Sequence, residues 1–173
     1  MLRRTNLDGD RQADLHVHGG PDRAVMLYGA AHYPLWEAEL GRRLEPGAFG
    51  ENLTVEGLDE WLACLGDVLA VGEALIQLSQ VRSPCYKVAY RNRVPDLVER
   101  ISTTGRSGFY ARVLREGRLW AGAPIELVER PNPKWTLDRA RHAYAARSPE
   151  LLAAAGLAEG WRHKLEVARA EGR

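Results

Sequence analysis

The chain has 173 residues, enough to bury a hydrophobic core in one domain of ordinary size or in one domain with a small appendage. Its 24 Lys and Arg residues balance 23 Asp and Glu residues, so the net charge of +1 provides no overall field that would attract nucleic acid or an acidic membrane surface. With two cysteines, no apolar run near the roughly 20 residues that span a bilayer and no apolar secretion segment at its start, the sequence predicts a cytoplasmic protein.

The first segments predict one strand and two short helices ahead of a β-rich region. Residues 12–18, QADLHVH, alternate in polarity and predict a short strand that ends in the glycine turn Gly19–Gly20. Pro21 then opens a helical pattern, which Pro34 is expected to break into two short helices. Between residues 42 and 72 turn formers are dense, and the pieces LTV, WLACL and VLAV suit short strands.

The centre of the chain predicts a strand that runs into a tetrad containing a cysteine. Residues 74–81, ALIQLSQV, alternate cleanly and lead directly into Arg82–Ser83–Pro84–Cys85. Residues 86–92 then predict a short helix, and residues 95–103 predict another, with Gly105 just beyond its end. The cysteine therefore stands between a strand and a helix.

The last part of the chain predicts more sheet and then a helical end. Residues 108–114 and 124–128 suit strands, with Glu116–Gly117 as a hairpin turn between them. Three short helices are then expected: one capped by Thr136 and running to about Ala146, one starting at Ser148–Pro149–Glu150, and one following Gly160. Because such short helices do not stand alone, we expect a small bundle over residues 132–173, docked on a β domain over residues 1–131.

Cys85 is the strongest candidate for chemistry in the sequence. Pro84 fixes the backbone before it, and Arg82 and Lys87 place positive charge nearby, which favours a thiolate. A thiolate can bind a soft metal or attack an electrophile. The alternative is a buried cysteine that acts as a small apolar side chain. That alternative is our expectation for Cys64, which lies in the apolar run WLACL without a nearby cation.

A second candidate site precedes the first predicted helix. Alternation along a strand would place Asp14, His16 and His18 on one face, where they could hold a first-row metal, although histidines on an exposed strand are more often solvated. The backbone N–H groups of Gly19–Gly20 could cradle an anion, or the pair could form an ordinary turn. The spacing alone does not separate these interpretations.

Two further segments offer polar groups to a ligand. In residues 49–54, FGENLT, Asn52 supplies an amide that donates and accepts, although a hairpin corner explains the segment too. Residues 104–112 combine glycines and hydroxyls with Arg106 and Arg112, which suits a phosphate or carboxylate pocket, although single arginines are often solvated. GxGxxG, P-loop and nucleophile-elbow motifs are absent, which argues against nucleotide-dependent dehydrogenases, kinases and α/β-hydrolases.

Four segments, taken in order, resemble one known family. HGGPDRAVMLY, FGENLTVEGL, LGDVLAVGEALIQLSQVRSPCYK and TGRSGFYARVL are similar to the MOSC domain, the molybdenum-cofactor sulfurase C-terminal type, and to its bacterial YiiM-like branch. The resemblance covers nearly the whole chain. It implies an α+β fold, in which a mostly antiparallel, barrel-like β domain precedes the small three-helix domain of that branch.

The resemblance also implies a cofactor and the residues that hold it. In the family the cofactor is molybdopterin-bound molybdenum, and Cys85 matches the cysteine whose thiolate ligates the metal. For the cofactor phosphate we expect donors at Arg82, Arg106, Arg112, His18, Gly19 and Gly20. Asn52 and Asp67 match family motif positions and are expected to orient loops around the cofactor. Pyridoxal phosphate binding is a further association of the family.

The activity that the resemblance implies is a reduction. The family suggests a detoxifying oxidoreductase that removes oxygen from N-hydroxylated compounds such as hydroxylaminopurines, hydroxylamines and amidoximes. Since the chain has no flavin or iron–sulfur motif, we expect a separate reductase to supply electrons, and no nucleic-acid or membrane partner. Two alternatives remain: a sulfur-carrying or cofactor-handling protein with a persulfide on Cys85, and a non-catalytic cofactor-binding module.

One departure from the family concerns the opening strands. Relatives of this type carry roughly two dozen or more additional residues before the segment NLDGDRQADLHVHGG, and these supply strands of the barrel. Either the start is misassigned, or the chain is a fragment, or another element replaces these strands. If the strands are missing, we expect residues 12–18 to form an edge or near-edge strand.

Overall fold

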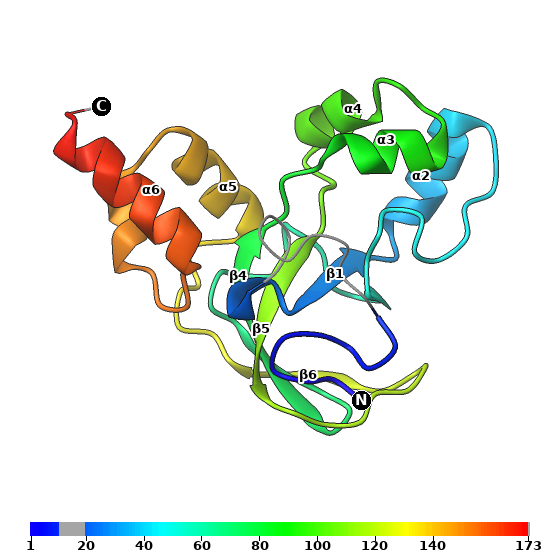
Figure 1. The fold of residues 1–173 in the computed structure, drawn as a ribbon, viewed down its shortest axis with the longest axis horizontal. Coiled ribbons are helices and arrows are strands. Elements are labelled where there is room, and N and C mark those ends of the chain that lie inside the picture. The colour runs from blue at the N-terminus through cyan, green and yellow to red at the C-terminus, as the bar shows by residue number, and fades with distance from the viewer. Residues whose placement is uncertain (11–19, 173) are drawn as a thin grey trace.

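A curved, six-stranded sheet with two groups of helices forms the molecule (Figure 1). The computed structural model describes residues 1–10 and 20–172. The strands are β1 (Val25–Gly29), β2 (Leu53–Val55), β3 (Val68–Val71), β4 (Ala74–Val81), β5 (Phe109–Arg115) and β6 (Ile125–Glu129). The α-helices are α2 (His32–Leu40), α3 (Tyr86–Asn92), α4 (Leu97–Thr104), α5 (Leu137–Ala145) and α6 (Glu159–Ala170). The short 3-10 helices are η1 (Pro21–Arg23) and η2 (Pro149–Ala153).

The sheet is antiparallel except at one edge. Its strand order is β2-β1-β5-β4-β3-β6, and among the described strands only β1 and β2 pair in parallel. The strands curl into a half-barrel, with α2, α3 and α4 grouped beyond one end and α5 and α6 beyond another (Figure 1). This architecture confirms the predicted α+β class with a mostly antiparallel, barrel-like sheet.

Most elements form where the sequence pattern places them. The strand predicted at 74–81 is β4, the helix at 86–92 is α3, and LTV and VLAV are β2 and β3. Thr136 caps α5, since its hydroxyl accepts a hydrogen bond from the Arg139 backbone N–H at 3.3 Å. Both the alternation of the strands and this cap are local signals, which is why the sequence alone locates these elements.

The helix predicted from Pro21 is wrong beyond its first turn. Only η1 is helical there, and the chain then forms β1, whose five residues are all buried between β2 and β5. A short apolar run buried on both faces has no alternation, so periodicity does not distinguish such a strand from a helix. Pro34 does not separate two helices; it lies in the first turn of α2, where a missing N–H costs nothing.

Two further predictions about the sheet are wrong. The segment WLACL is not a strand, although Cys64 makes an isolated bridge to Thr136. Glu116–Gly117 is not the turn of a hairpin, because β5 and β6 do not pair: β4 and β3 lie between them. Gly117 instead bridges Leu2. Both contacts join segments distant in sequence, which a local pattern does not reveal.

The hydrophobic core continues from the sheet into the helical end. One cluster joins sheet residues such as Leu69 and Ile76 to residues after 132, among them Leu137, Trp161 and Leu165. A second cluster lies between β1 and the helices α2, α3 and α4; it contains Met26, Tyr28, Trp36, Ala48, Phe49, Val88, Leu97 and Ile101. No helix in the described part of the chain is both long and apolar enough to cross a membrane.

Candidate cofactor site

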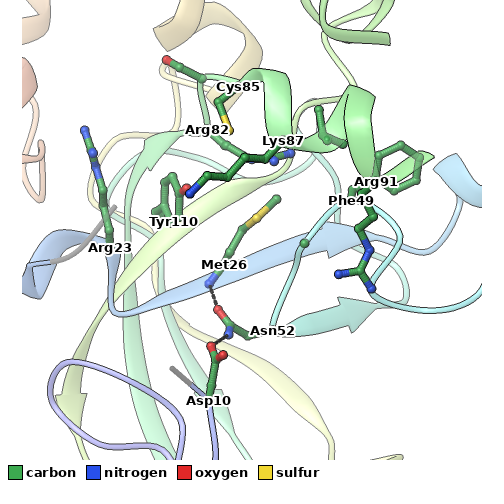
Figure 2. Close-up of a pocket in the computed structure, with 13 residues that line it drawn as sticks. Asp10, Arg23, Met26, Phe49, Asn52, Arg82, Cys85, Lys87, Arg91 and Tyr110 are labelled. Carbon is green, nitrogen blue, oxygen red and sulfur yellow. Dashed lines mark hydrogen bonds between the residues drawn. The ribbon is translucent and has the colours of Figure 1, made fainter. Parts of the chain in front are cut away.

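The hollow beside Cys85 lies where β4, β5, β1 and α3 meet. It has a volume of about 270 Å³. Its walls are formed by Asp10, Arg23, Met26, Phe49, Gly50, Asn52, Arg82, Ser83, Cys85, Lys87, Val88, Arg91 and Tyr110. Figure 2 shows the side chains of Arg82, Cys85 and Lys87 close together above the ribbon of β1 and β5. The walls of the hollow come from five separate stretches of the chain, at residues 10, 23–26, 49–52, 82–91 and 110.

Cys85 is held at the junction of strand and helix. Its backbone is extended, with φ −119° and ψ 166°, and it is the residue directly before α3. The Val88 backbone N–H donates to the Cys85 carbonyl at 3.1 Å, which ties the residue to the first helical turn. The side chain is a free thiol, neither fully buried nor fully exposed. This placement leaves its sulfur available to a ligand in the hollow.

Arg82 is a buried cation that no described group neutralises. The residue is 8% exposed, and its backbone N–H donates to the Gly108 carbonyl at 3.0 Å. Its Nη1 is buried and has no hydrogen-bond partner among residues 1–10 and 20–172. A buried polar group without a partner costs about 1–3 kcal/mol, and more when it is charged. An anion in the hollow would offset this cost.

The remaining charges make the hollow electropositive. Arg23, Lys87 and Arg91 join Arg82 in its walls, whereas Asp10 is the one carboxylate among the described lining residues. The Arg23 guanidinium lies 5.9 Å from the centre of the Tyr110 ring. Several arginines with a lysine suit a phosphate, whose oxygens accept charge-assisted hydrogen bonds.

Asn52 ties one wall of the hollow to β1. Its Oδ1 accepts from the Met26 backbone N–H at 2.8 Å, and its backbone N–H donates to the Met26 carbonyl at 3.0 Å. Its Nδ2 donates to Asp10 Oδ2 at 2.6 Å. The amide therefore orients the loop, and its donors and acceptors are already engaged.

Glu51, which the sequence pattern did not single out, organises the turn before β2. Its carboxylate accepts from the backbone N–H groups of Gly47 and Phe49, each at 3.1 Å, and from the Thr54 hydroxyl at 3.1 Å. The Tyr33 hydroxyl donates to the same group. Burial, followed by this contact with Glu51, raises the pKa of Tyr33. The turn that presents Phe49 and Asn52 is thus built around one carboxylate.

Arg106 and Arg112, predicted to hold phosphate, do not line this hollow. Arg106 Nη2 binds Glu39 Oε1 at 2.7 Å, and its guanidinium lies 4.4 Å from the centre of the Trp36 ring. Arg112 Nη2 binds Asp22 Oδ1 at 2.8 Å and the Gly156 carbonyl at 3.0 Å. Each keeps one buried nitrogen without a described partner, Nη1 and Nε respectively, but each is already neutralised by a carboxylate.

The glycine turn and the histidines lie partly outside the described residues. His18 and Gly19, the strand predicted at 12–18 and the possible Asp14–His16–His18 metal site fall in residues 11–19, which the structure does not describe. Gly20 is described: it precedes η1 with a φ of 102°, a conformation that favours glycine, and does not line the hollow. In the described part of the chain no group of three or more His, Cys, Asp or Glu residues could hold a metal ion.

Asp67 and Cys64 lie in a separate network. Asp67 is fully buried and accepts from the Cys64 backbone N–H at 2.9 Å and from Arg130 Nη2 at 2.7 Å. The Cys64 sulfur lies 3.7 Å from the Pro133 carbonyl oxygen, and burial raises the pKa of its thiol. Asp67 therefore orients the loop that meets the helical end, and Cys64 has the buried surroundings predicted for it.

Several residues of the hollow escaped the sequence interpretation. Arg23 follows the glycine pair in the segment HGGPDR, in which the sequence predicts only His18, Gly19 and Gly20 as site residues. Tyr110 and Arg112 share one face of β5 by alternation, yet the hollow reaches only Tyr110. Arg91 lies on α3 one helical turn beyond Lys87, a spacing that would have suggested a shared face.

Comparison with known proteins gives consistent matches. The family model described as MOSC domain matches residues 14–126. The chain is 46% identical over 168 residues to the uncharacterized protein YflK of Bacillus subtilis (strain 168), across 94% of this chain and 76% of that protein. It is 39% identical over 181 residues to protein YiiM of Escherichia coli (strain K12), across 100% of this chain and 81% of that protein.

Two further similarities concern a solved structure and a fungal protein. The crystal structure of YiiM from Escherichia coli superimposes with a TM-score of 0.85 at 35% identity, across 100% of this chain and 86% of that one. A protein named reductase from Gibberella moniliformis (strain M3125 / FGSC 7600) is 38% identical over 153 residues. That match covers 85% of this chain and 27% of the fungal protein.

Proposed function

The chain belongs to the MOSC domain family, and from this membership we propose that the hollow beside Cys85 holds the molybdenum cofactor and that the protein reduces N-hydroxylated compounds. Members of the family in general bind that cofactor, and a similar protein carries the name reductase. The substrate class comes from the family resemblance. A reducing compartment such as the cytoplasm, which keeps Cys85 a free thiol, is part of the proposal.

The donor set of the hollow fits the cofactor. Cys85 supplies a soft sulfur of the kind that molybdenum binds, and it is partly accessible. Arg82, whose buried Nη1 has no partner among the described residues, supplies donors for a phosphate, as do Arg23 and Arg91. The single observation that carries the proposal is this juxtaposition of a free thiol and a buried guanidinium without a carboxylate partner among the described residues. When bound, the cofactor supplies a metal centre that changes oxidation state by two electrons and accepts an oxygen atom.

The other walls of the hollow shape how a substrate approaches the proposed cofactor site. Met26, Phe49 and Val88 form an apolar side that excludes water from part of the space. Lys87 extends toward Tyr110 in Figure 2, and the two side chains bear N–H and O–H groups that can donate hydrogen bonds to a substrate. The proposed reaction consumes protons, because R–NHOH takes up two electrons and two protons to give R–NH2 and water. The electrons come from a separate redox protein.

The first test is elemental analysis combined with turnover. We would purify the protein from a host that makes the cofactor, measure molybdenum by mass spectrometry, and follow reduction of 6-hydroxylaminopurine with reduced methyl viologen as electron source. The expected result is close to one molybdenum per chain and viologen-dependent product. Protein that lacks molybdenum would overturn the proposal. Bound molybdenum without turnover would favour a binding module, and sulfur transfer to an acceptor without reduction would favour a persulfide on Cys85.

A further inference from the structure

The outward face of α3 carries side chains that the fold does not use. Tyr86 is 73% exposed and Tyr90 is 85% exposed, and the two lie four residues apart on one side of the helix. The helix is fixed from its other side, where Val88 and Asn92 are buried and Asn92 Nδ2 donates to the Ala48 carbonyl at 2.8 Å. The two tyrosines therefore contribute little to folding.

This face is also strongly basic. Lys87, Arg91 and Arg93 stand among the tyrosines, and the segment from residue 86 to residue 93 contains no acidic residue. We call Tyr86, Lys87, Tyr90, Arg91 and Arg93 the α3 face. Tyrosine and arginine are the side chains most enriched at energetically important positions of protein interfaces, because they bring large contact areas and several donors.

The α3 face adjoins the cofactor hollow directly. Lys87 and Arg91 also line that hollow, and the helix begins at the residue after Cys85. On the side away from Cys85, Tyr90, Arg91 and Arg93 line a second, open hollow of about 670 Å³ at the corner between α3 and α4. Figure 1 shows α3 and α4 side by side on the surface, in the group of helices separate from α5 and α6.

We propose that the α3 face is the docking surface for the electron donor, a redox protein with an acidic surface around a flavin or an iron–sulfur cluster. This inference rests on the proposed function. Each reduction of R–NHOH to R–NH2 and water consumes two electrons and two protons, and the donor is oxidised by the same two electrons. An electron donor bound on this face lies next to Cys85, because α3 begins at the residue after it. An acidic surface on the donor is complementary to Lys87, Arg91 and Arg93, since residues 86–93 contain no carboxylate. Such complexes are small and transient, on the order of 1,200 Å² or less.

The test compares two electron sources with holoenzyme of the wild type and of a double variant, Tyr90→Ser with Arg93→Asp. Neither residue lines the cofactor hollow. Arg93 has a φ of 54°, a left-handed conformation that Asp tolerates, so the charge reversal does not add strain. The matched control is Trp120→Ser with Arg147→Asp: Trp120 is 54% exposed, and Arg147 has a φ of 55° and lies after α5.

The electron sources are reduced methyl viologen, which needs no docking surface, and two acidic carriers, a reduced flavodoxin and a reduced plant-type ferredoxin. We expect the double variant to lose about tenfold or more in carrier-driven kcat/KM, because steering and docking are both impaired, while its viologen-driven rate and molybdenum content stay within about twofold. The control variant should retain both rates. Raising the salt concentration should slow only the carrier-driven reaction of the wild type.

The contrary outcomes separate the two proposals. Wild type without viologen-driven turnover means that the proposed function fails, and the docking inference fails with it. Wild type that works with viologen but with neither acidic carrier overturns the docking inference alone, as does equal carrier-driven turnover in the double variant and the control. If the double variant loses binding to a fluorescent single-stranded oligonucleotide but keeps its carrier-driven rate, the face binds nucleic acid and not a redox protein.

Discussion

At the scale of single residues, the two cysteines differ in the surroundings that decide thiol chemistry. Cys85 lies in the wall of an electropositive hollow, whereas Cys64 is 2% exposed and its pKa is raised by burial. We predict that Cys85→Ser lowers molybdenum content and turnover at least about tenfold, because a hydroxyl is a far poorer ligand for a soft metal. Cys64→Ser should keep both, since its new hydroxyl can donate to the nearby Pro133 carbonyl. The measurements are metal analysis and viologen-driven rate, and equal loss in both variants would contradict the assignment.

Arg82 and Arg106 allow a second residue-scale comparison. Arg82→Gln removes the buried charge that lacks a described partner, so cofactor occupancy should fall about tenfold while the free energy of unfolding of the cofactor-free protein stays the same or rises by up to about 1–3 kcal/mol. Arg106→Gln breaks the contact with Glu39 and the stacking on Trp36, so it should instead destabilise the fold by about 1 kcal/mol. Occupancy per folded chain and urea unfolding distinguish the two. If Arg106→Gln empties the site as fully as Arg82→Gln, the earlier expectation that Arg106 holds phosphate is the better one.

Site residues that are neighbours in the sequence could be predicted, whereas residues that only the fold brings together could not. The tetrad that contains Arg82 and Cys85 is contiguous, and the structure brings Asn52 to the same hollow. Arg23 and Arg91 line the hollow only because β1, β5 and β4 are neighbours in the sheet. No single segment of the sequence reveals this strand order. Arg112 illustrates the opposite error. Its position on β5 suggested a site residue, but its guanidinium pairs with the Asp22 carboxylate outside the hollow.

At the scale of elements, the same distinction explains the fold. β4 and α3 were predictable from local sequence. The polarity of β4 alternates along the strand, and Pro84 and Cys85 mark the boundary between the two elements. β1 was not predictable, since its burial on both faces removes the period that would identify it. The bridge from Leu2 to Gly117 likewise depends on residues more than a hundred positions apart. Pairing between such segments follows from the whole sheet.

The aromatic cluster of β1, α2 and the turn before β2 gives an element-scale prediction for alkaline pH. The Tyr28 ring stacks on Phe49 at 4.4 Å, its oxygen accepts from Trp36 Nε1 at 2.7 Å, and burial raises its pKa; burial and Glu51 raise the pKa of Tyr33. The unfolded chain loses these protons near pH 10 whereas the folded chain keeps them, so the unfolded state binds fewer protons and stability falls as the pH rises.

The measurement is the free energy of unfolding in urea between about pH 9 and pH 11. We expect a decline that begins near pH 10 and becomes shallower in Tyr33→Phe, because that variant removes one of the two tyrosines of the cluster whose pKa is raised. Tyr86→Phe is the control: Tyr86 is 73% exposed, and its replacement should leave the slope unchanged. Identical slopes in all three proteins would show that the cluster does not hold these protons.

At the scale of the whole molecule, the sheet and the helical end share one core and meet backbone to backbone. A Cβ added at Gly156, where φ is 76°, would lie 2.7 Å from the Gly66 Cα. We therefore predict one calorimetric transition for the chain, with Gly156→Ala lowering its Tm by about 3–10 °C without splitting it. Gly160→Ala, which meets no atom within 4 Å, should leave the Tm unchanged or slightly raised. Two separate transitions would instead support independent units over residues 1–131 and 132–173.

In the whole molecule, the unequal burial of the two cysteines leaves one thiol that reagents can label selectively. A maleimide or an aromatic disulfide reagent that meets the native protein finds Cys85 partly open and Cys64 enclosed. Before denaturant is added, one equivalent of thiol should therefore react, and after denaturant two. If the proposed cofactor is bound, its ligated sulfur should resist alkylation, so the same titration would count empty sites without reference to catalysis. The unmodified sequence of the cofactor-free protein should accept one fluorophore or spin label at Cys85.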